Sequence, residues 1–251
     1  MSGKVVLSRR MQAVADMVTP GSRVVDVGCD HGYVSIYLIQ CQKAEHVLAM
    51  DINEGPLLRA AQHVEEAKLR SYITLRLSDG LCEFVKGEAD TLICAGMGGR
   101  LMQRILERES DKTESIMELI LQPQSEITLF RQFLADKGYS IAEEDMVLEE
   151  GKFYPVMKAV KTGKIRPLSE LEQRFGPVLL MQKHPVLKQY LIFEWEKGLR
   201  LEKELMSHKA SCRISERLTD VRREMSFVKQ AAEITGVELP SGEVDIMWCC
   251  R

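Results

Sequence analysis

Apolar residues recur along the first 160 residues of the chain in two alternating patterns. Short apolar runs, several of them rich in β-branched side chains, predict buried strands at residues 24–27, 46–50, 72–77, 89–95 and 118–121. Apolar positions at helical spacing predict helices at residues 7–18, 33–38, 57–69, 101–109 and 126–137. Strands that alternate with helices are typical of a parallel sheet covered on both faces.

Turn-forming residues set the boundaries of these elements. Gly55 and Pro56 are expected to break the chain before the 57–69 helix. Two last strands, at 139–150 and 153–160, flank a glycine-containing sequence that predicts a hairpin turn.

The pattern changes after residue 160, and this predicts two domains, 1–160 and 161–251. A linker at 162–167 precedes three helical stretches at 168–181, 186–206 and 212–233. In the last stretch, apolar residues step alternately by four and three, as in a coiled-coil seam: Ile214, Leu218, Val221, Met225, Val228 and Ala232. We expect the two longer helices to form an antiparallel hairpin joined near 207–211. The tail from Gly236 either packs on this hairpin or stays free of it.

Aspartates and glycines follow the predicted strands. Asp26, Asp51 and Asp79 each lie at or just after the end of a strand, and Gly28 and Gly32 frame a loop between strand and helix. The carboxyl ends of parallel strands meet at one edge of a sheet, where such loops present backbone N–H groups to nucleotide-like ligands. The sequence therefore predicts a ligand site at this edge.

The charge of the loop distinguishes between two nucleotide-like cofactors. The dinucleotide fingerprint G-x-G-x-x-G is absent, and Asp30 would repel a pyrophosphate at close range. S-adenosylmethionine carries a sulfonium and an ammonium, so it tolerates Asp26 and Asp30. Asp51 is placed to accept from both ribose hydroxyls. Asp79 can accept from the adenine amine, or it can be a turn-forming residue before Gly80. An NAD dehydrogenase is disfavoured.

Other loops supply candidates for contact with a substrate. Gly96 and Met97 belong to a stretch with few side chains that can pass beneath the methionine part of the cofactor. Gln122, Pro123 and Gln124 stand where amide and backbone oxygens can hold the amine of a base. Phe153 and Tyr154 can stack on an extruded base or belong to the core. Arg9 and Arg10 can contact a phosphate or form a solvated helix face.

Charge and cysteine content limit the possible partners. The formal net charge is −3, but residues 161–234 carry 15 Lys and Arg against 10 Asp and Glu. This basic part fits either polyanion binding or a solvated helical surface. The first ten residues lack an apolar signal core, and no apolar run reaches the roughly 18 residues of a membrane span. Seven irregularly spaced cysteines predict reduced thiols, no metal site and a cytoplasmic protein. A monomer is the working expectation.

Six motifs together carry a resemblance to a known family: DVGCDHGY at 26–33, AMDINEGP at 49–56, SDG at 78–80, AGMGG at 95–99, QPQ at 122–124 and EGKFYP at 150–155. The set resembles the bacterial TrmK family of tRNA methyltransferases, which use S-adenosylmethionine to methylate N1 of adenine 22. Asp30-His31 replaces the glycine usual in class I methyltransferases, but it fits this family. The resemblance implies a Rossmann-like class I methyltransferase sheet with a C-terminal α-helical coiled-coil domain that binds tRNA.

The resemblance also implies a set of cofactor contacts: Asp26, Gly28, Gly32, Asp51, Ile52, Asp79, Gly80, Gly96 and Met97. Our catalytic hypothesis is that Asp30 and His31 contact the target base or take its proton while Tyr154 stacks on it. We expect six residues to bind the tRNA: Arg9, Arg10, Gln122, Pro123, Lys152 and Phe153. The alternatives are a methyltransferase that acts on another RNA, a protein or a small molecule, and a non-catalytic cofactor-binding coiled-coil protein.

Overall fold

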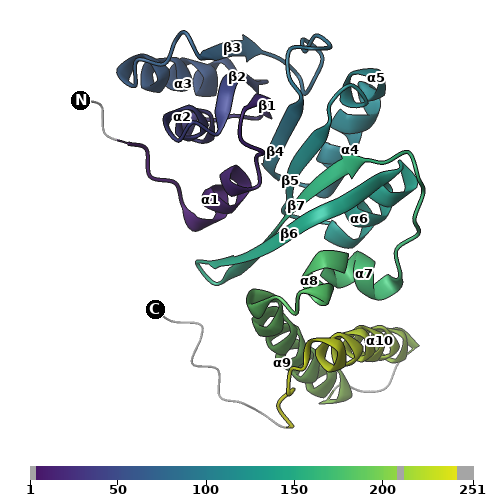
Figure 1. The fold of residues 1–251 in the computed structure, drawn as a ribbon. Coiled ribbons are helices and arrows are strands. Elements are labelled where there is room, and N and C mark those ends of the chain that lie inside the picture. Colours follow the sequence, from purple (N-terminus) through teal and green to yellow (C-terminus); the bar gives the residue numbers. More distant parts are fainter. Residues whose placement is uncertain (1–3, 208–211, 242–251) are drawn as a thin grey trace. The chain divides into compact units, whose positions relative to one another are not determined.

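The computed structural model describes residues 4–207 and 212–241, and the chain forms two compact units (Figure 1). The first unit contains the chain up to Glu149 together with Tyr154–Pro167. The second contains Glu150–Phe153 and the chain from Leu168 onward. Residues 208–211 of the predicted helical connection and residues 242–251 of the tail lie outside the described residues.

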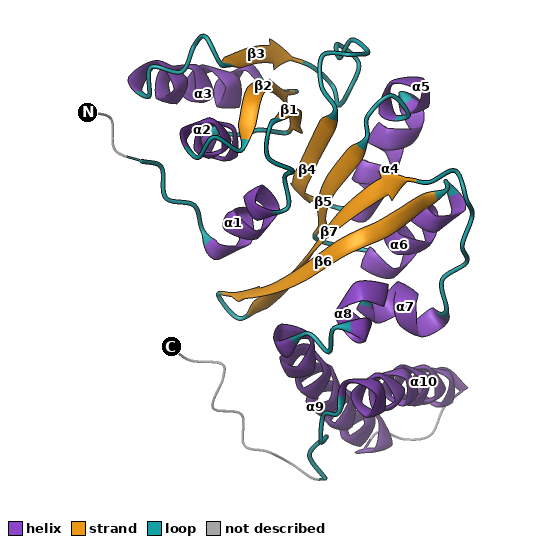
Figure 2. Ribbon diagram, viewed as in Figure 1, coloured by secondary structure: helices purple, strands orange, loops and turns teal. Residues whose placement is uncertain are grey.

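A seven-stranded sheet forms the centre of the first unit (Figure 2). Its strands are β1 (Ser22–Val27), β2 (Ala44–Asp51), β3 (Ile73–Leu77), β4 (Thr91–Met97), β5 (Glu118–Pro123), β6 (Tyr139–Glu149) and β7 (Lys152–Lys161). Their spatial order is β3-β2-β1-β4-β5-β7-β6. The first five strands run parallel, and β7 runs antiparallel to β5.

The predicted Rossmann-like sheet is therefore confirmed, with five parallel strands and the predicted hairpin of β6 and β7 at one edge. Glu150 and Gly151 join β6 to β7 as the predicted hairpin turn, and both residues have positive φ. A connection this short can join only antiparallel strands. Because β7 then inserts next to β5, one strand of the sheet runs opposite to its parallel neighbours.

Helices cover both faces of the sheet. They are α1 (Arg9–Asp16), α2 (Tyr33–Gln40), α3 (Glu54–Glu66), α4 (Gly99–Arg108), α5 (Ser110–Thr113) and α6 (Ile127–Asp136). Successive strand residues point to opposite faces, so Val24 packs with α1, α2 and α3, and Val25 packs with α4 and α6. This alternation divides the core of the unit into two apolar layers, one on each face.

Residues Gly55 and Pro56 do not break the chain as predicted. They lie in the first turn of α3, which begins at Glu54. Proline is tolerated there because the first backbone N–H groups of a helix have no intrahelical acceptor.

A buried polar network ties the last strand to the start of the unit. The Lys158 ammonium on β7 lies 3.0 Å from the Glu118 carboxylate and donates to the Met17 carbonyl at 3.0 Å. Glu118 also accepts from the backbone and side chain of Thr19 and from the Thr91 hydroxyl. Every charge in this network has partners, as burial requires.

The second unit consists mainly of helices: α7 (Glu170–Phe175), α8 (Pro177–Met181), α9 (Pro185–Ser207) and α10 (Cys212–Thr235). The single helix predicted at 168–181 is divided at Gly176, whose φ of 89° is non-helical and which precedes Pro177. The predicted seam on α10 is found, with Val221, Met225 and Val228 buried. At Gly198 on α9 an added Cβ would lie 2.6 Å from the Met225 side chain, so glycine permits close packing of the two helices.

Candidate active site

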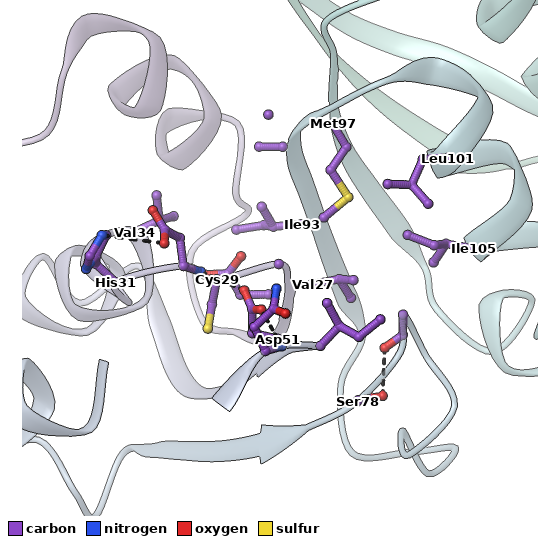
Figure 3. A pocket seen from close by; sticks show the side chains of 18 of the residues that line it. Val27, Cys29, His31, Val34, Asp51, Ser78, Ile93, Met97, Leu101 and Ile105 are labelled. Carbon is purple, nitrogen blue, oxygen red and sulfur yellow. Dashed lines mark hydrogen bonds and ion pairs between the residues drawn. The ribbon is translucent and has the colours of Figure 1, made fainter. Parts of the chain in front are cut away.

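A cavity of about 710 Å³ opens at the carboxyl ends of the parallel strands (Figure 3). In this view, Met97, Leu101 and Ile105 from β4 and α4 lie on one side, and His31 and Val34 lie on the other. Among the described residues, four aspartates line it: Asp26, Asp30, Asp51 and Asp79. The predicted clustering of acids from separate strand ends is therefore found.

The Asp51 carboxylate organises the loop that follows β1. Asp51 ends β2 and is buried. Its Oδ2 accepts the backbone N–H of Asp30 at 3.2 Å, and its Oδ1 accepts that of Asn53 at 2.9 Å. Asp30 has a φ of 49°, a conformation that costs a non-glycine residue energy. The hydrogen bond to Asp51 helps to hold Asp30 in that conformation.

Asp26 lies deeper in the same site, near the end of β1. It is 5% exposed, and Ser35 donates to its Oδ2 at 2.7 Å. The pKa of Asp26 is raised to about 6, mainly by burial; the hydrogen bond from Ser35 lowers it in part, and the nearby Asp51 adds a smaller upward effect. A carboxylate that is costly to keep charged in isolation is well suited to bind a cation.

Two glycines of the loop have different surroundings. Gly28 lines the cavity with a φ of 74°, and a Cβ there would lie 2.2 Å from the Met97 methyl group. Gly32 begins α2 and is not among the lining residues; its added Cβ would lie 3.2 Å from the Ala60 side chain. Gly28 therefore shapes the cavity, and Gly32 lets α2 pack closely against α3.

Asp79 is already paired with a cation. Arg108 on α4 donates to Asp79 Oδ2 at 2.6 Å, and both side chains are more than half exposed. Ile52 and Gly80 line the cavity near it, as the sequence predicts, together with Ile105. These neighbours give this part of the cavity the apolar character that suits an aromatic ring.

Arg10 forms a wall of the cavity on the side of β4 and β5. Its guanidinium lies 5.1 Å from the centre of the Tyr154 ring and donates to Gln122 Oε1 at 3.4 Å. Gln122 Oε1 also accepts the Gly96 backbone N–H at 3.0 Å. Arg10 lines the cavity and Tyr154 does not, so the planar group presented to the cavity is the guanidinium, backed by the ring.

His31 belongs to a cluster of rings at the cavity edge. Arg59 donates its Nε–H to His31 Nδ1 at 3.2 Å, which leaves the ring proton of neutral His31 on Nε2. That nitrogen lies 3.5 Å from Asp30 Oδ1. Tyr33 and His63 stack with ring centres 4.7 Å apart, and the centre of the His31 ring lies 5.9 Å from that of Tyr33 and 6.0 Å from that of His63.

Several predicted substrate residues lie elsewhere. Arg9, Gln122, Pro123 and Tyr154 are not among the cavity-lining residues, although Gln122 and Tyr154 contact Arg10 directly. Lys152 and Phe153 belong to the second unit. There the Phe153 ring packs 5.2 Å from Tyr190 and 5.6 Å from Phe193, as a core residue would.

Sequence reasoning missed a further set of lining residues: Cys29, Asn53, Ser78, Arg104 and Ile105. Gln124, named from the sequence as able to hold the amine of a base, does line the cavity. Cys29, Asn53 and Ser78 are direct neighbours of predicted residues, so adjacency could have found them. Arg104 and Ile105 have no local signal, because only the packing of α4 brings them to the cavity.

The described part of the chain contains neither a metal site nor a membrane-spanning helix. Within residues 4–207 and 212–241, no group of three or more His, Cys, Asp or Glu side chains is arranged to hold a metal ion. In the same ranges, no helix combines the length and the apolar character needed to cross a membrane.

Comparison with known proteins identifies the family. Residues 7–157 match a methyltransferase domain family. The crystal structure of the Bacillus subtilis m1A22 tRNA methyltransferase TrmK superposes with a TM-score of 0.79 at 31% identity, covering 90% of this chain and 99% of that one. The chain belongs to the TrmK family. The suspected family is thereby confirmed.

Two further relatives extend the comparison within the TrmK family. The Bacillus subtilis tRNA (adenine(22)-N(1))-methyltransferase is 40% identical over 153 residues, which span 61% of this chain and 64% of that protein. The structure of Streptococcus pneumoniae Sp1610 in complex with S-adenosyl-L-methionine superposes with a TM-score of 0.79 at 32% identity, covering 90% of this chain and 99% of that one. Relatives of this fold therefore bind the cofactor that the acids at the strand ends predict.

Proposed function

We propose that this chain transfers a methyl group from S-adenosylmethionine to N1 of adenine 22 in tRNA, the activity for which its Bacillus subtilis relatives are named. The observation that carries the proposal is the convergence of four aspartates on one cavity in the TrmK fold. Carboxylates are the groups that a ligand with a sulfonium and an ammonium requires, so the residues present fit this cofactor.

The geometry supports a set of individual cofactor contacts. Asp51 is held by backbone N–H groups in a fixed orientation, which suits acceptance from two ribose hydroxyls. Asp26 and the backbone at Gly28 and Gly96 would surround the methionine part. Asp79 would accept from the adenine amine of the cofactor, with Ile52 and Gly80 against the ring.

When bound, the cofactor would supply a methyl group carried on a sulfonium. The lone pair of adenine N1 would form a bond to the methyl carbon in line, as the carbon–sulfur bond breaks and its electron pair stays on sulfur. Neutral adenine needs no base before this step, because N1 already carries a lone pair. The chain therefore acts mainly by positioning and by excluding water. The positive charge ends on the adenine, and the Asp30 carboxylate at the cavity edge would stabilise it there.

His31 would act through Asp30 in this scheme. Its Nδ1 accepts from Arg59, so its Nε2–H faces Asp30 and orients that carboxylate. Tyr154 would act through Arg10 in the same way, since its ring supports the guanidinium. Of the three predicted catalytic residues, Asp30 would contact the target base directly. His31 and Tyr154 would be positioning residues that act through Asp30 and Arg10.

The second unit is the proposed tRNA-binding extension. Arg213 and Arg217 are exposed one turn apart on α10, where they can contact phosphates. The double variant Arg213→Glu/Arg217→Glu should weaken tRNA binding. It should also reduce the slope of log affinity against log salt concentration by the amount that corresponds to about two phosphate contacts. Cofactor binding should not change. A cytoplasmic location and a monomeric state remain predictions for a protein that acts on tRNA.

Transfer of a labelled methyl group to unmodified bulk tRNA, followed by nucleoside analysis, tests the function. We expect 1-methyladenosine, located at position 22 by primer extension. Methylation of a different nucleoside would favour a methyltransferase for another RNA. Cofactor binding without transfer to any RNA would favour the non-catalytic alternative.

A further inference from the structure

Two glutamines at the end of β5 differ in burial: Gln122 lies within the strand, and Gln124 directly follows it. Gln122 is fully buried, and its Oε1 is already occupied by the Gly96 N–H and by Arg10. Gln124 is exposed and lines the cavity. Among the described residues, no hydrogen bond of the Gln124 side chain is found. Gln122 therefore positions the wall, and Gln124 offers a free amide to the cavity.

The backbone of Gln124 is fixed even though its amide is free. Its N–H donates to the Met97 carbonyl at 2.8 Å, which continues the pairing of β4 with β5 beyond Pro123. Its Nε2 lies 3.8 Å from where a Cβ on Gly96 would stand, and Arg10 Nη1 lies 3.7 Å from the same point. The amide and the planar group on which a base can stack therefore border the same space at Gly96.

The reaction restricts which edge of adenine the chain can hold. N1 must face the methyl donor, so a hydrogen bond to N1 would block the attack. The N6 and N7 positions remain available, and a glutamine amide fits both at once: Oε1 accepts from N6 and Nε2 donates to N7. Guanine offers acceptors at both positions and does not match this pattern.

We propose that Gln124 is the residue that reads the target base, holding adenine by N6 and N7 and leaving N1 directed at the methyl donor. This inference rests on the proposed function and adds the recognition of the base to it. Arg10 supplies the stacking surface, and Gln122 and Tyr154 hold Arg10 in place.

The test uses full-length protein and two tRNA substrates, one with adenine and one with 7-deazaadenine at position 22. Single-turnover methylation rates are measured for wild type, Gln124→Ala and Gln124→Glu. The compared quantity is the ratio of the adenine rate to the 7-deazaadenine rate in each protein. Any intrinsic difference in N1 reactivity between the two bases cancels in this comparison.

We expect the ratio to be roughly tenfold larger in wild type than in either variant, because only wild type can donate to N7. Gln124→Glu retains the size of the side chain and the acceptor for N6, so it loses the N7 contact alone. Gln124→Ala should also slow methylation of the adenine substrate by about 10- to 100-fold. Equal ratios in all three proteins would overturn the proposal.

Control measurements separate base reading from folding and from the function itself. Calorimetric affinity for S-adenosylmethionine and filter-binding affinity for tRNA should stay within about twofold of wild type in both variants. Gln62→Ala, at an exposed glutamine of α3 outside the cavity, should match wild type in every rate. If wild type fails to methylate the adenine-22 substrate, the proposed function is refuted. If wild type is active but all three proteins have the same ratio of adenine rate to 7-deazaadenine rate, only the role of Gln124 is refuted.

Discussion

The Asp51 carboxylate fixes the backbone of Asp30, accepting its N–H at 3.2 Å across the gap between the ends of β1 and β2. A second bond, from the Asn53 N–H at 2.9 Å, holds the other carboxylate oxygen. One side chain therefore sets the conformation of two loops that border the cofactor cavity. Substitution at Asp51 tests loop geometry and ligand contact together.

Asp51→Asn should weaken binding of S-adenosylmethionine by roughly 10- to 150-fold. The new amide nitrogen would face a backbone N–H, and loss of a hydrogen bond to a charged group costs about 1.5–3 kcal/mol. Isothermal titration calorimetry measures the change. Asp111→Asn, at an exposed acid of α5 that pairs with Lys86, is the matched control and should bind as wild type does. Equal affinities for both variants would contradict the role of Asp51.

The affinity for S-adenosylmethionine should fall as the pH is lowered from 7 to 5. Burial raises the pKa of Asp26 to about 6, and the cationic ligand requires the charged form. Below that pH, binding must release a proton, and affinity falls by up to about tenfold per pH unit. Calorimetry at pH 6 in two buffers of different ionisation enthalpy detects the released proton. Asp26→Asn should show neither effect.

The same group affects stability in the absence of ligand. The pKa of Asp26 is higher in the folded state than in the unfolded state, so the folded state binds more protons between about pH 4 and 6. The contribution of Asp26 is therefore favourable at low pH and is lost as the pH rises through 6. Urea unfolding of Asp26→Asn should show a higher free energy of unfolding than wild type at pH 7, by about 2–3 kcal/mol.

Gly28→Ala should destabilise the protein through two separable effects. The φ of 74° costs an L-residue about 1–2 kcal/mol, and the new Cβ meets the Met97 methyl group at 2.2 Å. Adding Met97→Ala should recover the steric part and leave the backbone part. Gly87→Ala isolates the backbone part, since Gly87 has a φ of 90° and nothing within 4 Å. Urea unfolding of wild type, Gly28→Ala, Met97→Ala and the double variant gives the coupling free energy. A value of zero would show that Met97 moves aside without cost.

Lys158→Met should lower the free energy of unfolding by about 3–5 kcal/mol, because Glu118 would remain buried without its ammonium partner. Burial alone would raise the pKa of Glu118, but bonds from Thr19, Lys158 and Thr91 prevail and lower it. The double variant Lys158→Met/Glu118→Gln should regain much of the loss. Thermal unfolding by circular dichroism checks the order of the three stabilities. A double variant as unstable as the sum of its single variants would contradict the coupling.

Local sequence predicted the part of the site that consists of strand ends. Asp26, Gly28 and Asp51 owe their positions to the strand that each one ends or follows, and an apolar run reveals such a strand. The part that depends on distant contacts was not predictable. Tyr154 was expected to stack on a base, but its ring supports Arg10, which comes from the other end of the unit.

Which polar residues are buried was also not predictable from local sequence. Nothing in the QPQ motif distinguishes Gln122, which is fully buried, from Gln124, which is exposed. The pairing of β5 with β4 on one side and β7 on the other decides which glutamine is covered. The hairpin turn was predicted from the sequence, but the insertion of β7 next to β5 was not, because strand order depends on distant contacts.

The bond from Lys158 to the Met17 carbonyl spans 141 residues, and this has a consequence for synthesis on the ribosome. All five parallel strands emerge before β7, yet the ammonium opposite Glu118 and the ring behind Arg10 both arrive with that last strand. Closing such long loops is slow compared with forming local helices. The nascent chain thus completes the network around Glu118 and the support of Arg10 only once translation has passed Lys161, and any shortened version made for study should retain β7 to its end.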